Sequence, residues 1–565
     1  MLCCPRRDRV TSFWSVVTPD KSVAEIEAER WVFVVPYGVD KYCLPLCTVP
    51  FRRWMLFLAA FVAQFCNGSL YAWSILNDPI DGYIQTGDQN TTQTVDQHAV
   101  VTFYVACGCM GFACALFGPH VERQGPRASL LLGTFIFFIG NVISYVSVHF
   151  KLYAGLYVGY GLFCGVGFGI NYIAPVSALQ KWFPDLRGTA GGFAVCGFGL
   201  GATLWSNIYE PLMDAIGIDK LFLVVGSIIS VTLLLTSFVL RTPPPDFVVR
   251  GRDVHGVKVT STMVPKARED FDNLIPGDSG AITERVSTVL GDVQVVNYFK
   301  VFDYQEEELG EAEILYHNKI KNLQIRECVF SVDFAFLYLA FLTAVATGLI
   351  FMSRVVSLGK NVYNRQDDDA MTRLVMFIAI CNFMGRLLCP IVSDGVIRLL
   401  QINPAFGRKL TMSTLMVVQI VLLVWLPKII QDETTFDTFQ CLMCILTFCY
   451  GGVMGTIPSF LTDMYGVYNT GTMHGIILTC WALCAVAGGL TFQYFFYHVK
   501  DDHEGEGRLA EIAAYTFNFH WLLILVCIGC VLIPFVRTNP VDRFFPGYQI
   551  SFWGRPIVRW IRDDY

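Results

Sequence analysis

One arginine stands in the middle of a long apolar stretch, which reads Asn382-Phe-Met-Gly-Arg386-Leu-Leu-Cys-Pro390-Ile-Val-Ser-Asp394. A charge at the centre of a bilayer costs at least about 2.5–3.5 kcal/mol. We therefore expect Arg386 to face the protein interior or a wet cavity, not lipid. Its planar guanidinium suits a carboxylate, so the stretch predicts an anion-binding site. The alternative is a structural pairing of Arg386 with a helix end or with Asp333.

Two further ionisable residues lie inside apolar runs of the sequence. Asp333 follows the start of the seventh run by about one helical turn, and His474 follows the start of the eleventh. A buried carboxyl or imidazole can carry a proton. We therefore consider both residues for proton coupling, against a simple ion pair for Asp333 and interfacial packing for His474.

Catalytic and metal-binding patterns are missing from the sequence. It contains no Gly-x-Ser-x-Gly, no phosphate-binding loop ending in Gly-Lys-Ser/Thr and no His-Glu-x-x-His. Cys441 and Cys444 form a Cys-x-x-Cys pair, but this pair lies in an apolar run without histidines. No basic patch suggests nucleic-acid binding. We expect no enzyme activity, no metal, no cofactor and no ATP-driven pumping.

Apolar helices that cross a membrane must position these residues. Of 565 residues, 54% are hydrophobic and only 16% are charged, with a mean hydropathy of +0.49, whereas soluble domains carry about 25% charged residues. About 20 apolar residues span the hydrocarbon core. Runs of that length occupy residues 53–76, 97–118, 128–149, 152–174, 188–209, 219–240, 329–353, 372–394, 409–428, 438–460, 472–497 and 514–536.

The order of the runs predicts two related halves. Six runs, a long polar segment and six more runs indicate an all-α membrane protein with twelve helices in two six-helix bundles, around a site near mid-membrane. The expected parts are residues 1–52 as an N-terminal tail, 53–240 as the first bundle, 241–328 as a central connection, 329–536 as the second bundle and 537–565 as a C-terminal tail.

Basic residues predict the orientation. Lysine and arginine are concentrated in the two tails, in the central connection and in the short loops on the same side. Such residues favour the cytosol, so both termini are expected there. The first 50 residues lack the clean apolar region of a secretory signal. The plasma membrane and organellar membranes both remain open.

The loop after the second run reads Gly118-Pro-His-Val-Glu122-Arg123-Gln-Gly125-Pro-Arg127. Its glycines permit a tight turn, and its acid can pair with arginines and with a helix end, closing the inner side. The second half repeats the pattern more loosely. This signature resembles that of the major facilitator superfamily, and the resemblance implies gating roles for Glu122, Arg123, Arg127, Asp394, Arg408 and Asp463.

Residues 53–74, 181–192 and 463–475 resemble the monocarboxylate-transporter and oxalate:formate-antiporter branches of that superfamily. The resemblance covers the twelve runs but not the tails or the central connection. In these branches an arginine of the eighth helix binds the substrate carboxylate, and Arg386 falls on that position. At 1.5 Å per residue it lies roughly 12 Å from Asp394 and roughly 21 Å from Thr372, near mid-membrane.

One departure from the resemblance concerns charge. Oxalate:formate antiporters carry a lysine in the eleventh helix, where this chain has Trp481. A single fixed positive charge favours a monoanion, or a zwitterion such as an amino acid, over a dianion.

Several polar and aromatic residues are further candidates to line the cavity, although helix packing explains each of them equally well. The full set of expected substrate-binding residues is Arg386, Trp481, Asn67, Tyr71, Trp73, Asn171 and Tyr172.

The first hypothesis is therefore a secondary transporter that carries a small organic anion, a monocarboxylate, across the lipid bilayer by alternating access. The second keeps the fold and changes the substrate to a neutral or zwitterionic solute. The third is a membrane receptor or scaffold that acts through its tails and central connection. Deleting most of residues 250–300 is expected to spare transport under the first two hypotheses and to abolish function under the third.

Overall fold

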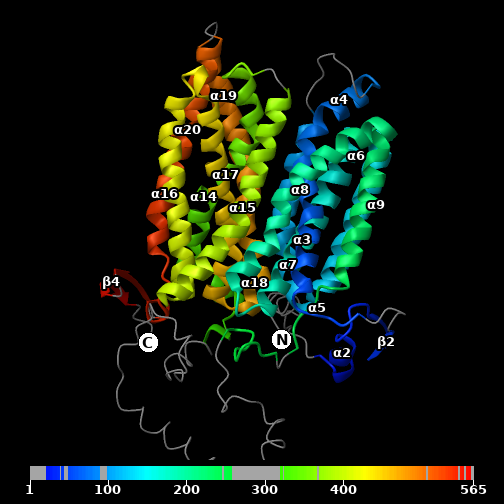
Figure 1. Cartoon of the computed structure of the whole chain (residues 1–565), viewed down its shortest axis with the longest axis vertical. Coiled ribbons are helices and arrows are strands. Elements are labelled where there is room, and N and C mark those ends of the chain that lie inside the picture. Colours follow the sequence, from blue (N-terminus) through cyan, green and yellow to red (C-terminus); the bar gives the residue numbers. More distant parts are fainter. Residues whose placement is uncertain are drawn as a thin grey trace, which may run out of the picture.

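The computed structural model describes residues 21–38, 40–43, 49–88, 98–244, 247–256, 319–321, 323–365, 368–503, 507–544, 547–552 and 555–561. Long helices form two bundles that stand side by side (Figure 1). The described parts of both tails lie at the same end of the bundles, which we call the tail side; the opposite end is the far side (Figure 1). Most of the expected central connection lies outside the described residues.

The first bundle is built from residues 55–237. Its elements are α3 (Met55–Asn67) with the 3₁₀ turn η1 (Gly68–Ile75), the short α4 (Asn77–Gln85), α5 (Ala99–His149), α6 (Tyr153–Leu156), the π-helical η2 (Tyr157–Cys164), α7 (Gly165–Trp182), α8 (Arg187–Ile216) and α9 (Ile218–Ser237). Within this bundle α6, η2 and α7 follow one another without a gap and act as one long helix.

The longest element, α5, contains two membrane crossings. Its 51 residues would extend about 77 Å as one helix, against a hydrocarbon core of about 30 Å. Gly125 divides them, because its φ of 80° and ψ of 165° are not helical. A positive φ of this kind is open to glycine at little steric cost, which is why the turn of the predicted signature forms here.

The second bundle is built from residues 332–535. Its elements are α14 (Val332–Asn361), α15 (Asp368–Leu400), α16 (Pro404–Ile429), η6 (Glu433–Thr435), α17 (Phe436–Tyr465), η7 (Val467–Asn469), α18 (Thr470–Leu483), the π-helical η8 (Cys484–Gly488), α19 (Gly489–Asp502), α20 (Arg508–Leu532) and η9 (Ile533–Phe535). The short α13 (Ile325–Val329) precedes it and α21 (Pro540–Arg543) follows it.

Together the bundles make twelve crossings. Ten helices of the described chain are long and apolar enough to span a membrane, and one of them is the double-length α5. The thirty residues of α8 extend about 45 Å and add the twelfth. The predicted all-α, twelve-helix architecture is confirmed. Several helices run beyond the predicted apolar runs, because hydropathy marks the hydrocarbon core and not the end of a helix.

The two bundles meet closely along two helix pairs, α5 with α18 and α8 with α15. A Cβ atom added at Gly475 of α18 would lie 2.0 Å from the Cys114 carbonyl oxygen of α5. A Cβ atom added at Gly192 of α8 would lie 2.8 Å from the Arg386 carbonyl oxygen of α15. Glycine at these positions lets the two backbones approach, as in other membrane helix interfaces.

An N-terminal segment packs against the tail-side end of α9. It contains α2 (Val23–Ala28) and a hairpin of β1 (Val35–Gly38) and β2 (Lys41–Cys43). Arg241 donates hydrogen bonds to the carbonyls of Glu29, Trp31 and Val32. Burial lowers the pKa of Arg241 to about 10, so this arginine stays charged at neutral pH and holds the segment in place.

Candidate functional site

Arg386 lies fully buried near the middle of α15, between the two bundles. Its Nε donates to Asn382 Oδ1 over 3.1 Å, and its Nη1 donates to the Val195 carbonyl of α8 over 3.3 Å. Its Nη2 has no hydrogen-bond partner among the described residues. A buried guanidinium therefore keeps both N–H donors of one nitrogen unsatisfied, an arrangement that costs free energy unless an acceptor enters.

The local sequence fixes the backbone at Arg386. Pro390 lies inside α15 and lacks the N–H that would otherwise bond to the Arg386 carbonyl four residues earlier. Gly455 of α17 packs on this carbonyl so closely that an added Cβ would lie 2.2 Å from its oxygen. The arginine is thus held by helices of both bundles.

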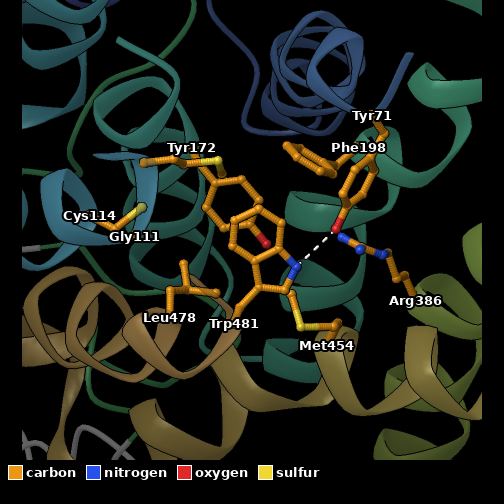
Figure 2. A pocket seen from close by; sticks show the side chains of 10 residues that line it. Tyr71, Gly111, Cys114, Tyr172, Phe198, Arg386, Met454, Leu478 and Trp481 are labelled. Atoms are coloured by element: carbon orange, nitrogen blue, oxygen red, sulfur yellow. Dashed lines mark hydrogen bonds between the residues drawn. The ribbon is translucent and has the colours of Figure 1, made fainter. Parts of the chain in front are cut away.

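A cavity opens beside the guanidinium (Figure 2). Arg386 contributes its charged group, and the rest of the wall is aromatic or apolar. The lining residues are Tyr71, Met110, Gly111, Cys114, Tyr172, Phe198, Arg386, Met454, Leu478 and Trp481. They come from α5, α7, α8 and η1 of the first bundle and from α15, α17 and α18 of the second, so the cavity belongs to the bundle interface.

Three aromatic side chains join the bundles at this cavity. The Trp481 indole N–H lies 2.9 Å from the Tyr71 hydroxyl, a contact drawn in Figure 2, and 3.2 Å from the Tyr450 hydroxyl. The two hydroxyls lie 3.3 Å apart. Tyr71 belongs to the first bundle, whereas Tyr450 and Trp481 belong to the second. The three groups place hydrogen-bonding atoms next to an otherwise apolar wall.

The cavity is tightly closed in this conformation. Its volume is about 10 Å³, close to the smallest space that holds one water molecule. A carboxylic acid with even two carbons needs more room than that. Any organic ligand must therefore enter in a conformation in which the bundles have moved apart.

The structure places four predicted binding residues together and separates the other three. Arg386, Tyr71, Tyr172 and Trp481 line the cavity. Trp73 does not: it is buried in the first bundle, donates to the Ala99 carbonyl over 3.1 Å and packs on Tyr160.

Asn67 and Asn171 are also buried but do not line the cavity. Their amide atoms have no hydrogen-bond partner among the described residues. An added Cβ at Gly133 would lie 2.3 Å from the Asn171 Oδ1 atom. Asn171 therefore packs against the helix that carries Gly133, in line with the helix-packing alternative.

Sequence reasoning missed the apolar part of the wall and the Tyr450 hydroxyl. Phe198, Met454 and Leu478 line the cavity from three different helices, and nothing in their local sequence separates them from packing residues. Tyr450 is a polar-tipped side chain between apolar residues and two glycines, the same kind of signal that marked Tyr71.

The tail-side end of the bundle interface is joined by a carboxylate of the second bundle. Asp394, at the tail-side part of α15, accepts from the backbone N–H groups of Gly188 and Thr189 over 3.0 and 2.7 Å. These groups open α8 of the first bundle, where a helix N-terminus favours a negative charge. Arg408 of α16 pairs with the same carboxylate.

A carboxylate of the first bundle makes the reciprocal contact. Glu122 of α5 accepts from the Gly471 N–H at the start of α18 over 2.7 Å and from the Ser177 hydroxyl over 3.0 Å. Lys181 of α7 pairs with it. Each bundle thus sends one paired carboxylate to a helix N-terminus of the other, as expected for two related halves.

Asp463 completes the tail-side contacts. It lies at the end of α17 and pairs with Arg187 of α8 over 3.0 Å and with Arg408 over 3.4 Å. The pair with Arg187 crosses between bundles and the pair with Arg408 stays within the second bundle. Lys181 and Arg187 belong to the segment 181–192, and neither of them was assigned a role from the sequence alone.

Arg127 differs from the other predicted gating residues. Arg123 is half-buried beside Glu122 in the chain. Arg127 donates to the carbonyls of Ser237 and Phe238 at the end of α9 and to Val34 of the N-terminal segment. These bonds stay within the first half of the chain, so Arg127 ties the N-terminal segment to α9 and does not join the bundles. The gating role of Arg127 had been expected from its place in the signature motif and not from any contact.

Asp333 makes the ion pair that was the alternative to proton coupling. Its carboxylate oxygens accept from Arg537 Nε over 3.0 Å and Nη2 over 2.8 Å, at the tail-side end of α14. The residue does not line the cavity. This two-bond contact holds the carboxylate away from the bundle interface, as the ion-pair alternative expects.

His474 lies between the cavity and the tail-side contacts. Its ring is fully buried on α18 and stacks on Tyr172 of α7, with centroids 5.9 Å apart and planes 16° apart. Neither ring nitrogen has a hydrogen-bond partner among the described residues. Because α18 and α7 belong to different bundles, this stacking crosses the bundle interface.

The cavity combines one positive charge with neutral hydrogen-bonding groups. The cavity lining contains one guanidinium, two tyrosine hydroxyls and an indole N–H, but no aspartate or glutamate. The described residues contain no group of three or more histidine, cysteine, aspartate or glutamate side chains that could hold a metal ion. A fixed cation in an apolar wall attracts a single negative charge.

A family model matches most of the chain. The model of the Major Facilitator Superfamily matches residues 53–489. The chain is 22% identical to the oxalate:formate antiporter of Oxalobacter formigenes, over 78% of this chain and 84% of that protein. It is 20% identical to human monocarboxylate transporter 14, over 85% of this chain and 91% of that protein.

Other relatives agree on the fold. The uncharacterized transporter YhjX of Escherichia coli K12 is 20% identical over 75% of this chain and 84% of its own. The solved structure of the human organic anion transporter MFSD10 superimposes with a TM-score of 0.51 at 14% identity, covering 85% of this chain and 99% of that chain. The proton:xylose symporter XylE gives a TM-score of 0.53 at 13% identity, covering 86% and 97%. With twelve crossings, two bundles and this family match, the chain belongs to the major facilitator superfamily.

Proposed function

We propose that this protein is a secondary transporter of a small organic anion, a monocarboxylate, that works by alternating access. The observation that carries the proposal is Arg386: a fully buried guanidinium at the bundle interface, with one nitrogen that lacks a partner among the described residues. A carboxylate offers the acceptor oxygens and the negative charge that this group lacks.

The cavity chemistry supports a monoanion. Its lining carries one guanidinium and no acidic side chain, and Trp481 stands where a second cation would favour a dianion. The apolar wall of Phe198, Met454 and Leu478 suits a short hydrocarbon body. The wall offers no carboxylate for the ammonium group of a zwitterion, so an amino acid is the weaker candidate.

The tail-side contacts supply the gate in this proposal. Asp394, Glu122 and Asp463 hold the bundles together at the tail side, which we take as cytosolic from the distribution of basic residues. Separating these contacts while closing the far side carries the anion across. Because an anion on Arg386 neutralises the buried charge, the loaded protein can change conformation at lower electrostatic cost than the empty one.

Uptake into proteoliposomes tests the role of Arg386. Arg386→Lys retains the charge but loses the planar two-donor group, and Arg386→Gln loses both. We expect a fall in uptake of radiolabelled monocarboxylates of about tenfold for lysine and to background for glutamine, equivalent to at least about 1.4 kcal/mol.

Arg354→Gln is the control, because Arg354 lies toward the far end of α14, where its guanidinium packs 5.6 Å from the Phe492 ring. It should transport like the parent. Unchanged uptake by a folded Arg386→Gln protein would refute the anion-binding role. Competition by an uncharged amide of the same acid, as strong as by the acid itself, would favour a neutral substrate.

A further inference from the structure

The C-terminal hairpin combines one anchored strand with one exposed strand. β3 (Gly547–Phe552) and β4 (Arg555–Ile561) pair antiparallel, with Tyr548 opposite Trp560 and Ile550 opposite Val558. The Tyr548 hydroxyl donates to the Phe535 carbonyl over 3.0 Å. Its ring also lies 4.5 Å from the Arg537 guanidinium. The inner strand is therefore fixed to the tail-side end of the second bundle.

The outer strand is apolar, and no described part of the chain covers it. Exposed fractions along β4 are 64% for Ile557, 37% for Val558, 54% for Trp560 and 68% for Ile561. Alternate residues of a strand point to opposite faces, so both faces of β4 carry exposed apolar side chains. An isolated two-stranded hairpin is marginal in water, and an exposed apolar edge invites aggregation. A surrounding medium must cover this strand.

The position of the hairpin indicates which medium that is. β4 projects sideways from the second bundle, at the level where the helices end on the tail side (Figure 1). A membrane that surrounds the helices reaches its surface at this level. The unpaired backbone groups of an edge strand are excluded from the hydrocarbon core but are satisfied among head groups and water. Tryptophan is enriched at this depth.

A bilayer surface also explains the two-faced exposure better than a protein partner does. A partner protein or a second copy would cover one face of the strand, whereas interfacial lipid surrounds both. Arg559 is exposed between Ile557 and Ile561 on the same strand. A cation beside apolar anchors is the combination that binds a membrane surface carrying negative charge.

We propose that β4 is a membrane-surface anchor whose partner is anionic phospholipid in the tail-side leaflet. Ile557, Trp560 and Ile561 reach the boundary between head groups and acyl chains, and Arg559 meets the phosphate groups. The anchor fixes the end of α20 relative to the bilayer surface. This inference is independent of the transported substrate.

Tryptophan quenching in the intact protein tests the anchor. The full-length protein is placed in lipid nanodiscs with and without lipids brominated near the head-group end of the acyl chain. The chain has eleven tryptophans, so subtracting the Trp560→Phe spectrum isolates Trp560. We expect bromine to reduce this difference signal by about twofold or more, and aqueous acrylamide to quench it about threefold less than free tryptophan. Trp425→Phe supplies the reference for a lipid-facing residue, because Trp425 is 56% exposed on α16.

Lipid charge separates the apolar contribution from the electrostatic one. Hydrogen exchange of residues 547–561 should be several-fold slower in discs with anionic lipid than in purely zwitterionic discs, and Arg559→Gln should remove that difference. Acrylamide quenching as strong as for free tryptophan would overturn the anchor, since the strand would then stand in water. Protection from both bromine and acrylamide would overturn it as well, because the strand would then be covered by protein.

Discussion

Arg386 and His474 are both buried at the bundle interface, but their nitrogen atoms differ in hydrogen bonding. Two nitrogens of Arg386 reach acceptors, whereas neither ring nitrogen of His474 has a partner among the described residues. A histidine without hydrogen bonds gains little from its ring nitrogens in this conformation. The His474 side chain therefore either packs against Tyr172 or binds a proton when the bundles separate.

His474 is expected to make tail-side opening pH-dependent. The Tyr172 ring of α7 stacks on the His474 ring. The Glu122 carboxylate of α5, which pairs with Lys181 of α7, contacts the Gly471 N–H three residues earlier on α18. Opening the tail side brings water to the ring, which can then bind a proton. Acid on the tail side should therefore favour the open state.

Spin-label distances across the tail side, recorded at pH 5.5 and 7.5, would measure this effect. The parent should open more at the lower pH by several-fold in population, and His474→Gln should lose most of that response. His498→Gln is the control, because His498 is an exposed residue of α19. An equal pH response in His474→Gln would assign the effect to other groups.

At the scale of helices, two close pairs hold the tail side together. α5 meets α18 and α8 meets α15, and each pair combines glycine contacts with a carboxylate at a helix N-terminus. The glycines set the separation of the backbones and the carboxylates add directional bonds. Closure therefore depends on helix approach as well as on charge.

Gly475→Ala should weaken tail-side closure. The added Cβ would meet the Cys114 carbonyl oxygen at 2.0 Å and Ile173 Cδ1 at 3.0 Å, so α18 must move away from α5. Overpacking of this kind typically costs about 1–3 kcal/mol, enough to populate the open state several-fold more. Cross-linking yield between cysteines introduced at the tail ends of α5 and α18 measures the change.

Gly395→Ala is the matched control on α15. A Cβ atom added there meets no atom within 4 Å, so cross-linking should match the parent. If Gly475→Ala cross-links as readily as Gly395→Ala, close approach of α5 and α18 is not needed for closure.

At the scale of the whole molecule, the described part of the central connection reaches both bundles beneath the tail-side contacts. Arg187 Nη2 of α8 donates to the Val254 carbonyl over 3.3 Å, and the His255 ring lies 4.7 Å from the Tyr468 ring of η7. Lys321 pairs with Asp253 over 2.7 Å. Residues 253–256 therefore add contacts to the closed tail side.

These contacts shorten the range of residues whose removal is expected to spare transport. Replacing residues 260–310 with a Gly-Ser linker of equal length should leave uptake close to that of the parent, because the described contacts of the connection that precede this segment belong to residues 253–256. Extending the replacement to residues 250–310 should raise tail-side accessibility by several-fold, since the Val254 and His255 contacts are then lost. Cysteine-labelling rates at the tail side and uptake rates measure both variants. Loss of uptake in the shorter replacement would instead support a signalling role for the connection.

Much of the architecture could be predicted from local sequence. Apolar runs of about 20 residues specify crossing helices, and the glycine-rich signature around Gly125 specifies a turn. The charge of Arg386 inside an apolar run marked a buried site, because an isolated cation that faced the lipid would be unfavourable. Tyr71 and Tyr172 were found for a related reason: each brings a polar tip into an apolar helix. Trp481 was found because it stands where the resembling antiporters carry a lysine.

The remaining site residues depended on which helix faces meet. Local sequence does not distinguish Trp73, which packs inside the first bundle, from Tyr71, which reaches the cavity two residues earlier. Arg127 and Asp333 looked like gating and proton-coupling residues until their partners, the end of α9 and Arg537, were visible. Partners distant in sequence decide such roles.

The sequence by itself determined a twelve-helix membrane protein with one cation near mid-membrane, because hydrophobic length and the cost of a membrane charge are local properties. The tertiary structure alone decided that Arg386 shares a cavity with Tyr71, Tyr172 and Trp481, and that Glu122 and Asp394 reach the helix ends of the opposite bundle. These contacts join residues up to several hundred positions apart. They exist because glycine-lined helix faces let the two bundles approach, and only the packed molecule brings those faces together.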